Sequence, residues 1–214
     1  TILGRVQTIR QHVFGFEHAN AGSIFGKIFI PSQFRWPARR GEESFYRAYM
    51  RKRGFRLSRL STRAFFEGEG DLLSVGQTYF AGYGIRSQAA AHQEAARRMN
   101  LRLALLRLVH PHFYHLDTCF APLNQKSALI FMPAFETYAQ MVLLENVADP
   151  ILVPEKEALN FACNALVLDS DIVIPDNCPE TKEQLEKRGF RVYELNFSEF
   201  MKSGGAAKCL VLKL

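Results

Sequence analysis

A short pattern recurs along the chain at long intervals. KRGFRL at 52–57 returns as KRGFRV at 187–192, and a weaker copy, MNLRL, carries Asn100 where the other two carry Gly54 and Gly189. Each copy follows a helix-like stretch and precedes an apolar run, so the Gly or Asn is placed to end a helix in the left-handed conformation. Internal repeats of this kind are typical of solenoids, propellers and arrays. The chain is therefore expected to consist of repeated units.

Each copy lies within the same expected order of elements: a two-strand hairpin, a helix and a third strand. The hairpins are predicted in SIFGKIFIP, LLSVGQTYFAGYG, CFAPLNQKSALIFM and ALVLDSDIVIP. The helices are predicted at 41–53, 87–99, 134–147 and 179–189, and the third strands at 55–60, 101–109, 151–154 and 191–197. The helices argue against a pure β solenoid and the strands against a pure α solenoid, which leaves a ring of α/β modules as the natural closed arrangement. The terminal AKCLVLKL is expected to open a fifth unit, which only the N-terminus could complete.

The composition is that of an ordinary globular chain, with 48% apolar and 22% charged residues among 214. No stretch approaches the roughly 20 apolar residues that a membrane-spanning helix needs. The net charge of +6 comes from scattered Lys and Arg, and the sequence has neither a nucleotide-binding loop nor a basic patch interleaved with aromatic residues. No membrane, nucleic-acid partner or cofactor is therefore expected. The oligomeric state is not decided, and a homo-oligomer is left open.

The four cysteines lie far apart and lack the spacing of a zinc site or a CxxC motif. Reduced thiols in a cytoplasmic protein fit this pattern better than a disulfide framework, and no signal peptide is visible at the start. Cys119, Cys163 and Cys178 are interpreted as structural thiols. His110 and His112 are interpreted as solvated or structural rather than as a metal cluster, so no metal is expected.

Polar motifs precede the first strand of each expected unit: ANAG, FEGEGD, YHLD, FACNA and GGAAKC. In a ring of modules the equivalent strand edges converge on one central channel, so these motifs would meet there. The side chains that they would bring together are Asn20, Glu67, Asp71, His115, Asp117, Asn164 and Cys209. A thiol, an imidazole and several carboxylates at one point make a nucleophilic site.

The sequence resembles the guanidine-modifying, or pentein, superfamily, and within it the bacterial dimethylarginine dimethylaminohydrolase or amidinotransferase family. The resemblance covers about residues 16–214 and rests on HANAG, RWPARRGEE, FEGEGDLL, GYGIRS, FYHLDTCFAPL, NFACNALVL and SGGAAKCLVL. It implies an α/β-propeller of ββαβ modules around a central channel, with residues 1–214 as a single domain. A complete ring in this family is longer, so we expect an N-terminal truncation in which the fifth module is missing or reduced to residues 1–15.

The resemblance also implies a reaction and three catalytic residues. Cys209 matches the nucleophile that attacks the central carbon of a guanidinium to form a covalent thiouronium, and Gly204–Gly205 before it would let the backbone approach closely. His115 matches the histidine that protonates the leaving amine and then activates water. Glu67 matches the acid that binds the guanidinium. Glu69 remains the alternative to Glu67. In the family the second acid of this motif follows the first by three residues, whereas here Asp71 follows Glu67 by four.

The substrate-binding residues that the resemblance implies are Asp117, Asn20, Asp71, Arg86, Arg39 and Asn164. Asn20 stands where many relatives carry Asp, and an amide supplies no charge to clamp a guanidinium. Arg86 and Arg39 are candidates for binding a substrate carboxylate, although either fits a surface arginine equally well. Asn164 fits a hydrogen-bonding residue of the channel or a structural turn residue.

The leading hypothesis is a cysteine hydrolase of a guanidino compound such as arginine or a methylarginine, which releases a ureido product and an amine. A guanidinium is planar and stays charged, so paired hydrogen bonds to carboxylates are needed to align it for attack. An amidinotransferase, in which an amine replaces water as the acceptor, is the enzymatic alternative. A truncated, non-catalytic relative with a binding or structural role is the third hypothesis, and it is favoured by Asn20, the altered acid spacing and the shortened N-terminus.

Overall fold

The computed structural model describes residues 19–213, and the contribution expected from residues 1–15 lies outside the described residues. The described chain forms four three-stranded sheets, each from one stretch of sequence. In every sheet the second strand lies in the middle, antiparallel to the first and parallel to the third. A helix connects the second strand to the third. The expected ββαβ unit is therefore confirmed, and it occurs four times.

The units follow one another along the chain. The first unit contains η1 (Ala19–Ala21), β1 (Gly22–Phe25), β2 (Ile28–Pro31), η2 (Pro37–Arg39), α2 (Arg40–Lys52) and β3 (Arg56–Leu57). The second contains η3 (Gly68–Gly70), β4 (Leu72–Val75), β5 (Thr78–Tyr83), α3 (Ala89–Met99) and β6 (Arg102–Arg107). The third contains η4 (Leu116–Thr118), β7 (Phe120–Pro122), β8 (Ser127–Ile130), η5 (Met132–Ala134), α4 (Thr137–Asn146) and β9 (Asp149–Leu152). The fourth contains α5 (Glu155–Leu159), β10 (Leu166–Leu168), β11 (Asp171–Pro175), α6 (Pro179–Glu186) and β12 (Arg191–Leu195), and α7 (Ser198–Met201) follows it.

The residues that the repeat placed at helix ends do adopt the left-handed conformation. Gly54 and Gly189 have φ of 83°, and Asn100 has φ of 52°. Such a residue turns the chain back after the helix, so that the next segment runs beside the middle strand of its sheet. The helices and strands of the four units were thus predicted correctly in type, while several of these elements are shorter than predicted. The strand expected at 55–60 is only Arg56–Leu57.

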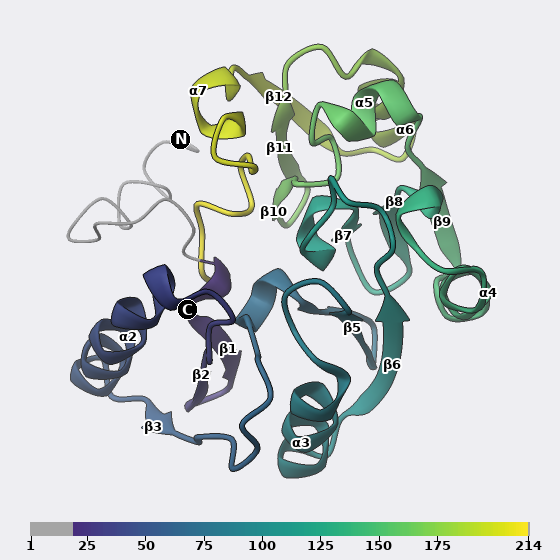
Figure 1. The fold of residues 1–214 in the computed structure, drawn as a ribbon. Helices are drawn as coiled ribbons and strands as arrows, with labels where there is room; N and C mark the ends of the chain where they lie inside the picture. The colour runs from purple at the N-terminus through teal and green to yellow at the C-terminus, as the bar shows by residue number, and fades with distance from the viewer. Residues whose placement is uncertain (1–18, 214) are drawn as a thin grey trace.

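The four units lie side by side in an arc, and the chain after α7 runs back from the fourth unit to the first (Figure 1). The backbone N–H of Ala19 donates to the carbonyl oxygen of Cys209 at 3.3 Å. Leu212 packs against the apolar cluster of the first unit, beside Phe29 and Met50. The C-terminal segment therefore joins the two ends of the arc.

One expectation about this segment is wrong. AKCLVLKL was expected to form a strand, but residues 207–210 form a turn and residues 211–213 have no regular structure. The reason lies in the hydrogen bonds of the backbone. Ala206 and Cys209 donate their N–H groups to the side-chain oxygen of Asn164, and Lys208 donates to the backbone oxygen of the same residue. These donors are consequently not available to a strand ladder.

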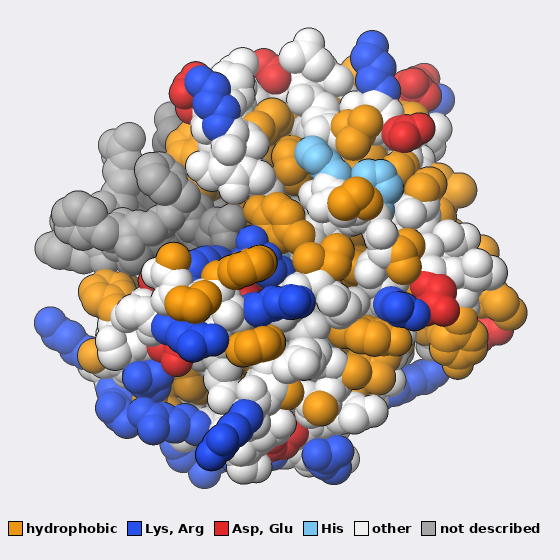
Figure 2. Space-filling model, viewed as in Figure 1, with side chains coloured by type: hydrophobic (Ala, Val, Ile, Leu, Met, Phe, Trp, Pro, Cys, Tyr) orange, Lys and Arg blue, Asp and Glu red, His pale blue; other side chains and the backbone are white. Residues whose placement is uncertain are grey.

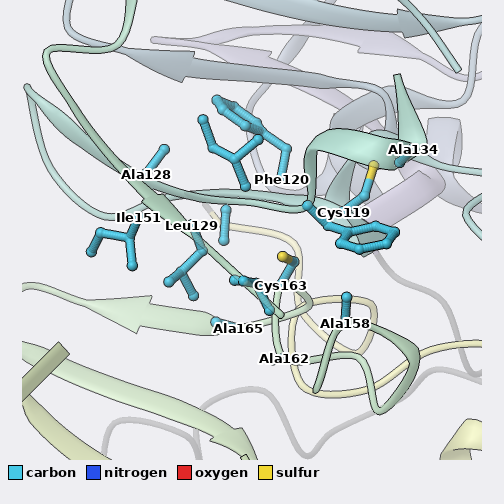
Figure 3. Packing of buried hydrophobic residues seen from close by; sticks show 14 of the residues in the cluster. Cys119, Phe120, Ala128, Leu129, Ala134, Ile151, Ala158, Ala162, Cys163 and Ala165 are labelled. Carbon is cyan, nitrogen blue, oxygen red and sulfur yellow. The ribbon is translucent and has the colours of Figure 1, made fainter. Parts of the chain in front are cut away.

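The largest core cluster extends from the second unit to the fourth. Figure 3 shows the part of it that lies in the third and fourth units. Cys119, Phe120 and Cys163 lie within it and are fully buried. Burial raises the pKa of the Cys119 and Cys163 thiols, and it raises the pKa of Cys178 to about 11. These three thiols are free and remain protonated near neutral pH, as expected for cysteines that serve packing.

The surface is less uniform in charge than the sequence suggested. Lys and Arg side chains gather over the first unit, around α2 and β3 (Figure 2). Exposed or half-exposed members of this group are Arg47, Arg51, Lys52, Arg53, Arg56, Arg59 and Arg63. None of the described helices combines the length and the apolar character that crossing a membrane requires.

Candidate active site

The polar motifs before the first strands form short turns that meet inside the molecule. η1 carries Asn20, and η3 packs against both η1 and η4. Asn164 comes from the turn that precedes β10, and Cys209 comes from the turn at 207–210. The seven side chains predicted to converge are at most 1% exposed: Asn20, Glu67, Asp71, His115, Asp117, Asn164 and Cys209. Burying so many polar groups is costly unless they bind one another or a ligand.

The thiol of Cys209 lies between an amide and a carboxylate. The side-chain N–H of Asn164 donates to Sγ at 3.2 Å, and the Asp117 carboxylate lies 3.7 Å from Sγ through Oδ2. The other end of the Asn164 side chain accepts the backbone N–H groups of Cys209 at 3.2 Å and Ala206 at 2.8 Å. Asn164 therefore fixes both the turn and the sulfur atom that the turn presents.

The backbone beside the thiol must be glycine. A Cβ atom added at Gly205 would lie 2.7 Å from the Sγ of Cys209, which is closer than real Cβ atoms come. This close approach fits the Gly204–Gly205 pair seen in the sequence. It means that the thiol is packed against main chain on this side.

His115 and Glu67 form a buried pair. Nε2 of His115 lies 2.7 Å from Oε2 of Glu67, and both side chains are fully buried. Burial by itself lowers the pKa of His115, but the carboxylates of Asp71, Glu67 and Asp117 outweigh it, so the pKa is raised. Burial by itself raises the pKa of Glu67, but His115, Arg86 and a backbone N–H outweigh it, so that pKa is lowered. The pair is therefore an imidazolium with a carboxylate, in which Nε2–H donates to Oε2.

The other nitrogen of His115 is placed to exchange a proton. Among the described residues, no group forms a hydrogen bond with its Nδ1, although the atom is buried. A buried polar atom in this condition indicates a position where a substrate or a water molecule binds. The imidazole is thus held at Nε2 and left for chemistry at Nδ1.

The structure separates the two acids between which the sequence left a choice. Glu67 contacts His115, and its Oε2 also lies 3.3 Å from the guanidinium of Arg86. Glu69 instead forms an ion pair with Lys208 at 3.2 Å. Glu67 is accordingly the acid of the cluster, and its position beside His115 makes it a positioning residue for the imidazole as much as a candidate for binding a cation.

Asp71 links three segments. Its carboxylate accepts the backbone N–H and the hydroxyl of Ser87, at 3.2 and 2.6 Å, and the backbone N–H of Leu116 at 3.0 Å. Burial raises its pKa to about 6 in spite of the lowering effect of His115. The same Ser87 hydroxyl accepts the backbone N–H of Glu67 at 2.9 Å. Ser87 was not singled out from the sequence, although it ends the GYGIRS motif that was used for Arg86.

The two arginine candidates lie in different surroundings. Arg86 is in the cluster, where its guanidinium contacts Glu67 and lies 4.6 Å from the ring centre of Tyr114. Arg39 lies at the start of α2, where it forms a bidentate ion pair with Glu42 and stacks on a phenylalanine. The structure therefore places Arg86, and not Arg39, next to the acids of the site.

Tyr114 is a second residue that the sequence did not reveal. Its ring supports Arg86, and its hydroxyl donates to the carbonyl oxygen of Gly204 at 2.8 Å. It thereby connects the arginine of the second unit to the glycine segment that leads to the thiol. Its only signal in the sequence was its position directly before His115.

Asn20 lies against the main chain of η3. A Cβ atom added at Gly70 would be 2.0 Å from Oδ1 of Asn20 and 3.5 Å from Cδ2 of His115. The amide of Asn20 is thus packed beside the imidazole, and only glycine at position 70 allows this approach. Across the described residues, no group of three His, Cys, Asp or Glu side chains is arranged to hold a metal ion.

A family model described as N,N dimethylarginine dimethylhydrolase, eukaryotic, matches residues 19–214. The chain belongs to the dimethylarginine dimethylaminohydrolase family. This membership accounts for the fold, since solved pentein structures share it. The N-terminal domain of ArgZ, crystallised as a cysteine-to-serine variant bound to substrate, superposes with a TM-score of 0.91 at 36% identity and covers 99% of this chain and 84% of that one.

Two relatives with curated names are similar to most of this chain. The bifunctional arginine dihydrolase/ornithine cyclodeaminase ArgZ of Synechocystis is 40% identical over 201 residues, which are 92% of this chain and 28% of that protein. The N(G),N(G)-dimethylarginine dimethylaminohydrolase of Mycobacterium tuberculosis is 38% identical over 196 residues, which are 92% of this chain and 64% of that protein. The chain thus spans less than two thirds of the length of either relative.

Proposed function

We propose that this chain carries the catalytic centre of a cysteine hydrolase that acts on a guanidino compound, with arginine or a methylarginine as the substrate class. The observation that carries the proposal is the position of Cys209, whose sulfur contacts the Asp117 carboxylate and the Asn164 amide. The buried His115–Glu67 pair belongs to the same cluster. The names of the relatives support the substrate class.

The first half of the proposed reaction forms a covalent bond to sulfur. A free cysteine has a pKa of about 8.5, so the thiolate needs stabilisation by hydrogen bonds and nearby cations. The Asn164 N–H and the substrate guanidinium supply it. The thiolate of Cys209 adds to the guanidinium carbon, His115 gives a proton to the departing nitrogen, and an amine or ammonia leaves. An S-alkylthiouronium on Cys209 remains.

The second half consumes water. His115, which is now neutral, takes a proton from a water molecule, and the hydroxide adds to the thiouronium carbon. The carbon–sulfur bond then breaks, the product leaves as a ureido compound, and the thiol is restored. The Asp117 carboxylate accepts hydrogen bonds from the guanidinium N–H groups throughout, because paired hydrogen bonds align a planar cation. Arg86 binds the carboxylate of the amino-acid end of the substrate.

A second candidate is complete degradation of arginine by two successive hydrolyses. The two arginine dihydrolases, ArgZ and the AgrE of Nostoc, favour it, at 40% and 36% identity to this chain. In that case the ureido product would re-enter the same cycle, and ornithine, ammonia and carbon dioxide would be the final products. The residues required are the same, so product analysis has to distinguish the two candidates.

The test is product analysis on the purified chain with arginine, asymmetric dimethylarginine and agmatine in turn. Citrulline with ammonia or dimethylamine supports a single hydrolysis, and ornithine without added amine supports two. Cys209→Ser should abolish turnover, while Cys178→Ala should retain it. Formation of product only with an added acceptor amine would make the protein an amidinotransferase. The absence of any product, together with no adduct on Cys209 after treatment with chloroacetamidine, would overturn the proposal.

A further inference from the structure

The first strands of the four units enclose a second space next to the catalytic cluster. It has a volume of about 200 Å³, and we call it the axial cavity. Its lining includes Ser23, Leu73, Phe120, Val167, Lys208 and Lys213. The side chains of Cys209, His115 and Glu67 are not part of the described lining. The axial cavity is therefore separate from the proposed active site, although Lys208 directly precedes Cys209.

The charge of the axial cavity is positive. Lys208 and Lys213 line it together with one carboxylate, that of Glu69. Glu69 is already engaged by Lys208, at 3.2 Å. Among the described residues, no carboxylate lies within ion-pair distance of the Lys213 ammonium. Lys213 is an exposed residue on which Glu69 and Asp169 act only beyond ion-pair distance, so its ammonium is available to an anion in the cavity.

A buried hydroxyl in the same lining indicates a binding position. The side chain of Ser23 is buried, and within the described chain its Oγ has no hydrogen-bond partner. A buried hydroxyl without a partner raises the free energy of the folded protein. An anion oxygen would accept this O–H and would at the same time balance the charge of Lys213.

The remaining wall of the axial cavity is mostly apolar, with Ser74 and Tyr79 as its other polar side chains. Phe25, Leu73, Phe120 and Val167 contribute to it. A single water molecule needs only about 10–15 Å³ of such space, so the volume accommodates a group larger than one ion. Polar groups at one place in an otherwise apolar cavity are typical of sites for small organic molecules.

We propose that the axial cavity binds a small organic anion, whose carboxylate or phosphate group contacts Lys213 and Ser23 and whose apolar part lies against Leu73, Phe120 and Val167. This site is distinct from the place where a guanidino substrate would bind. It does not depend on the proposed function, since neither the thiol nor the imidazole takes part.

The test is a titration of the ¹⁵N-labelled chain, followed by amide chemical shifts, with butyrate, acetate, inorganic phosphate and uncharged butyramide as separate probes. Butyrate is expected to shift the amides of Ser23, Leu73 and Val167 and to bind more tightly than acetate, because only butyrate fills the apolar wall. Butyramide is expected to leave these amides unshifted. Phosphate binding at the same amides with equal or greater affinity than butyrate would identify a phosphorylated ligand as the source of the anion.

Substitutions of lining residues test whether the observed binding takes place in the axial cavity. Lys213→Gln and Ser23→Ala should each weaken butyrate or phosphate binding by about tenfold, the effect of losing one charge-assisted hydrogen bond. Lys202→Gln is the matched control, because it removes the same charge from an exposed ion pair with Glu199 outside the cavity. Absence of shifts at the cavity amides, or affinities that Lys213→Gln and Ser23→Ala leave unchanged, would overturn the proposal.

Discussion

Asn164 holds Cys209 from both sides of the peptide turn: its Nδ2 donates to Sγ at 3.2 Å, and its Oδ1 accepts the backbone N–H of the same cysteine at 3.2 Å. The two residues are 45 positions apart in the sequence. The amide therefore has a role that neither a carboxylate nor an aliphatic side chain can take. An aspartate would keep the acceptor but bring a negative charge to the sulfur.

Asn164→Asp should consequently impair the nucleophile more than the fold. We expect kcat/KM for the guanidino substrate to fall by about 10² or more, since one donor to a developing charge is typically worth that much. The rate of inactivation by chloroacetamidine should reach its half-maximum at higher pH than in the wild type, because the carboxylate disfavours the thiolate. Asn164→Ala should lower the melting temperature as well. An Asn164→Asp enzyme with unchanged inactivation kinetics would show that the contact has no chemical role.

The His115–Glu67 pair predicts a pH dependence of stability. The folded pKa of His115 is raised above its ordinary value of 6.5, so its contribution is fully present below pH 6.5 and is lost as the pH rises through the folded pKa. The folded pKa of Glu67 is lowered from 4.5, so its contribution is present above pH 4.5 and is lost as the pH falls through the folded value. The pair thus stabilises the protein most between these limits.

Comparison with Glu67→Gln isolates this contribution. The free energy of unfolding of the wild type, measured by urea denaturation, should exceed that of Glu67→Gln by the largest margin near pH 5–6, and the margin should shrink at alkaline pH. In NMR titrations the imidazole of His115 should titrate above pH 6.5 in the wild type and lower in Glu67→Gln. A margin that stays constant from pH 5 to pH 9 would contradict the assignment of a charged pair.

Ser87 connects the Asp71 carboxylate to the main chain of Glu67, because its hydroxyl donates to Asp71 at 2.6 Å and accepts the backbone N–H of Glu67 at 2.9 Å. Ser87→Ala removes one of the hydrogen bonds that Asp71 accepts and leaves the buried N–H of Glu67 without its hydroxyl partner, and an unsatisfied buried group typically costs about 1–3 kcal/mol. We expect this loss of stability in urea denaturation, together with a lower kcat, because the main chain of Glu67 is held less firmly and Glu67 in turn positions the imidazole of His115. Ser87→Thr keeps the hydroxyl and should retain most of both. Equal behaviour of the two variants would show that the hydroxyl is unimportant.

The repeat in the sequence was sufficient to predict the unit and its helix ends, because local conformation decides both. Gly54, Asn100 and Gly189 are left-handed as predicted. The convergence of the polar motifs was also predictable, since equivalent strand edges must meet when similar units are arranged around an axis. These features follow from short-range pattern and from symmetry.

What the sequence did not reveal depends on contacts between distant residues. The apolar alternation of AKCLVLKL is that of a strand, yet Asn164 accepts the backbone N–H groups of Lys208 and Cys209, and residues 207–210 form a turn. The partner of Glu67 proved to be His115, and Glu69 proved to bind Lys208. Neither pairing is encoded in local spacing, because the partners lie in different units.

Gly205 offers the sharpest test of how closely the main chain must approach the thiol. A Cβ atom at this position would lie 2.7 Å from Sγ of Cys209 and 3.0 Å from its Cβ, so Gly205→Ala must displace the cysteine or the turn. We expect turnover to fall by at least about tenfold, since misplacement of a nucleophile by as little as 1 Å can cost about 10²-fold. Gly41→Ala is the matched control, because it lies in α2 with nothing within 4 Å of an added Cβ. It should leave activity unchanged and stabilise the helix by about 0.5–1 kcal/mol. Full activity in Gly205→Ala, measured with the same substrate, would mean that the thiol is not used where the structure places it.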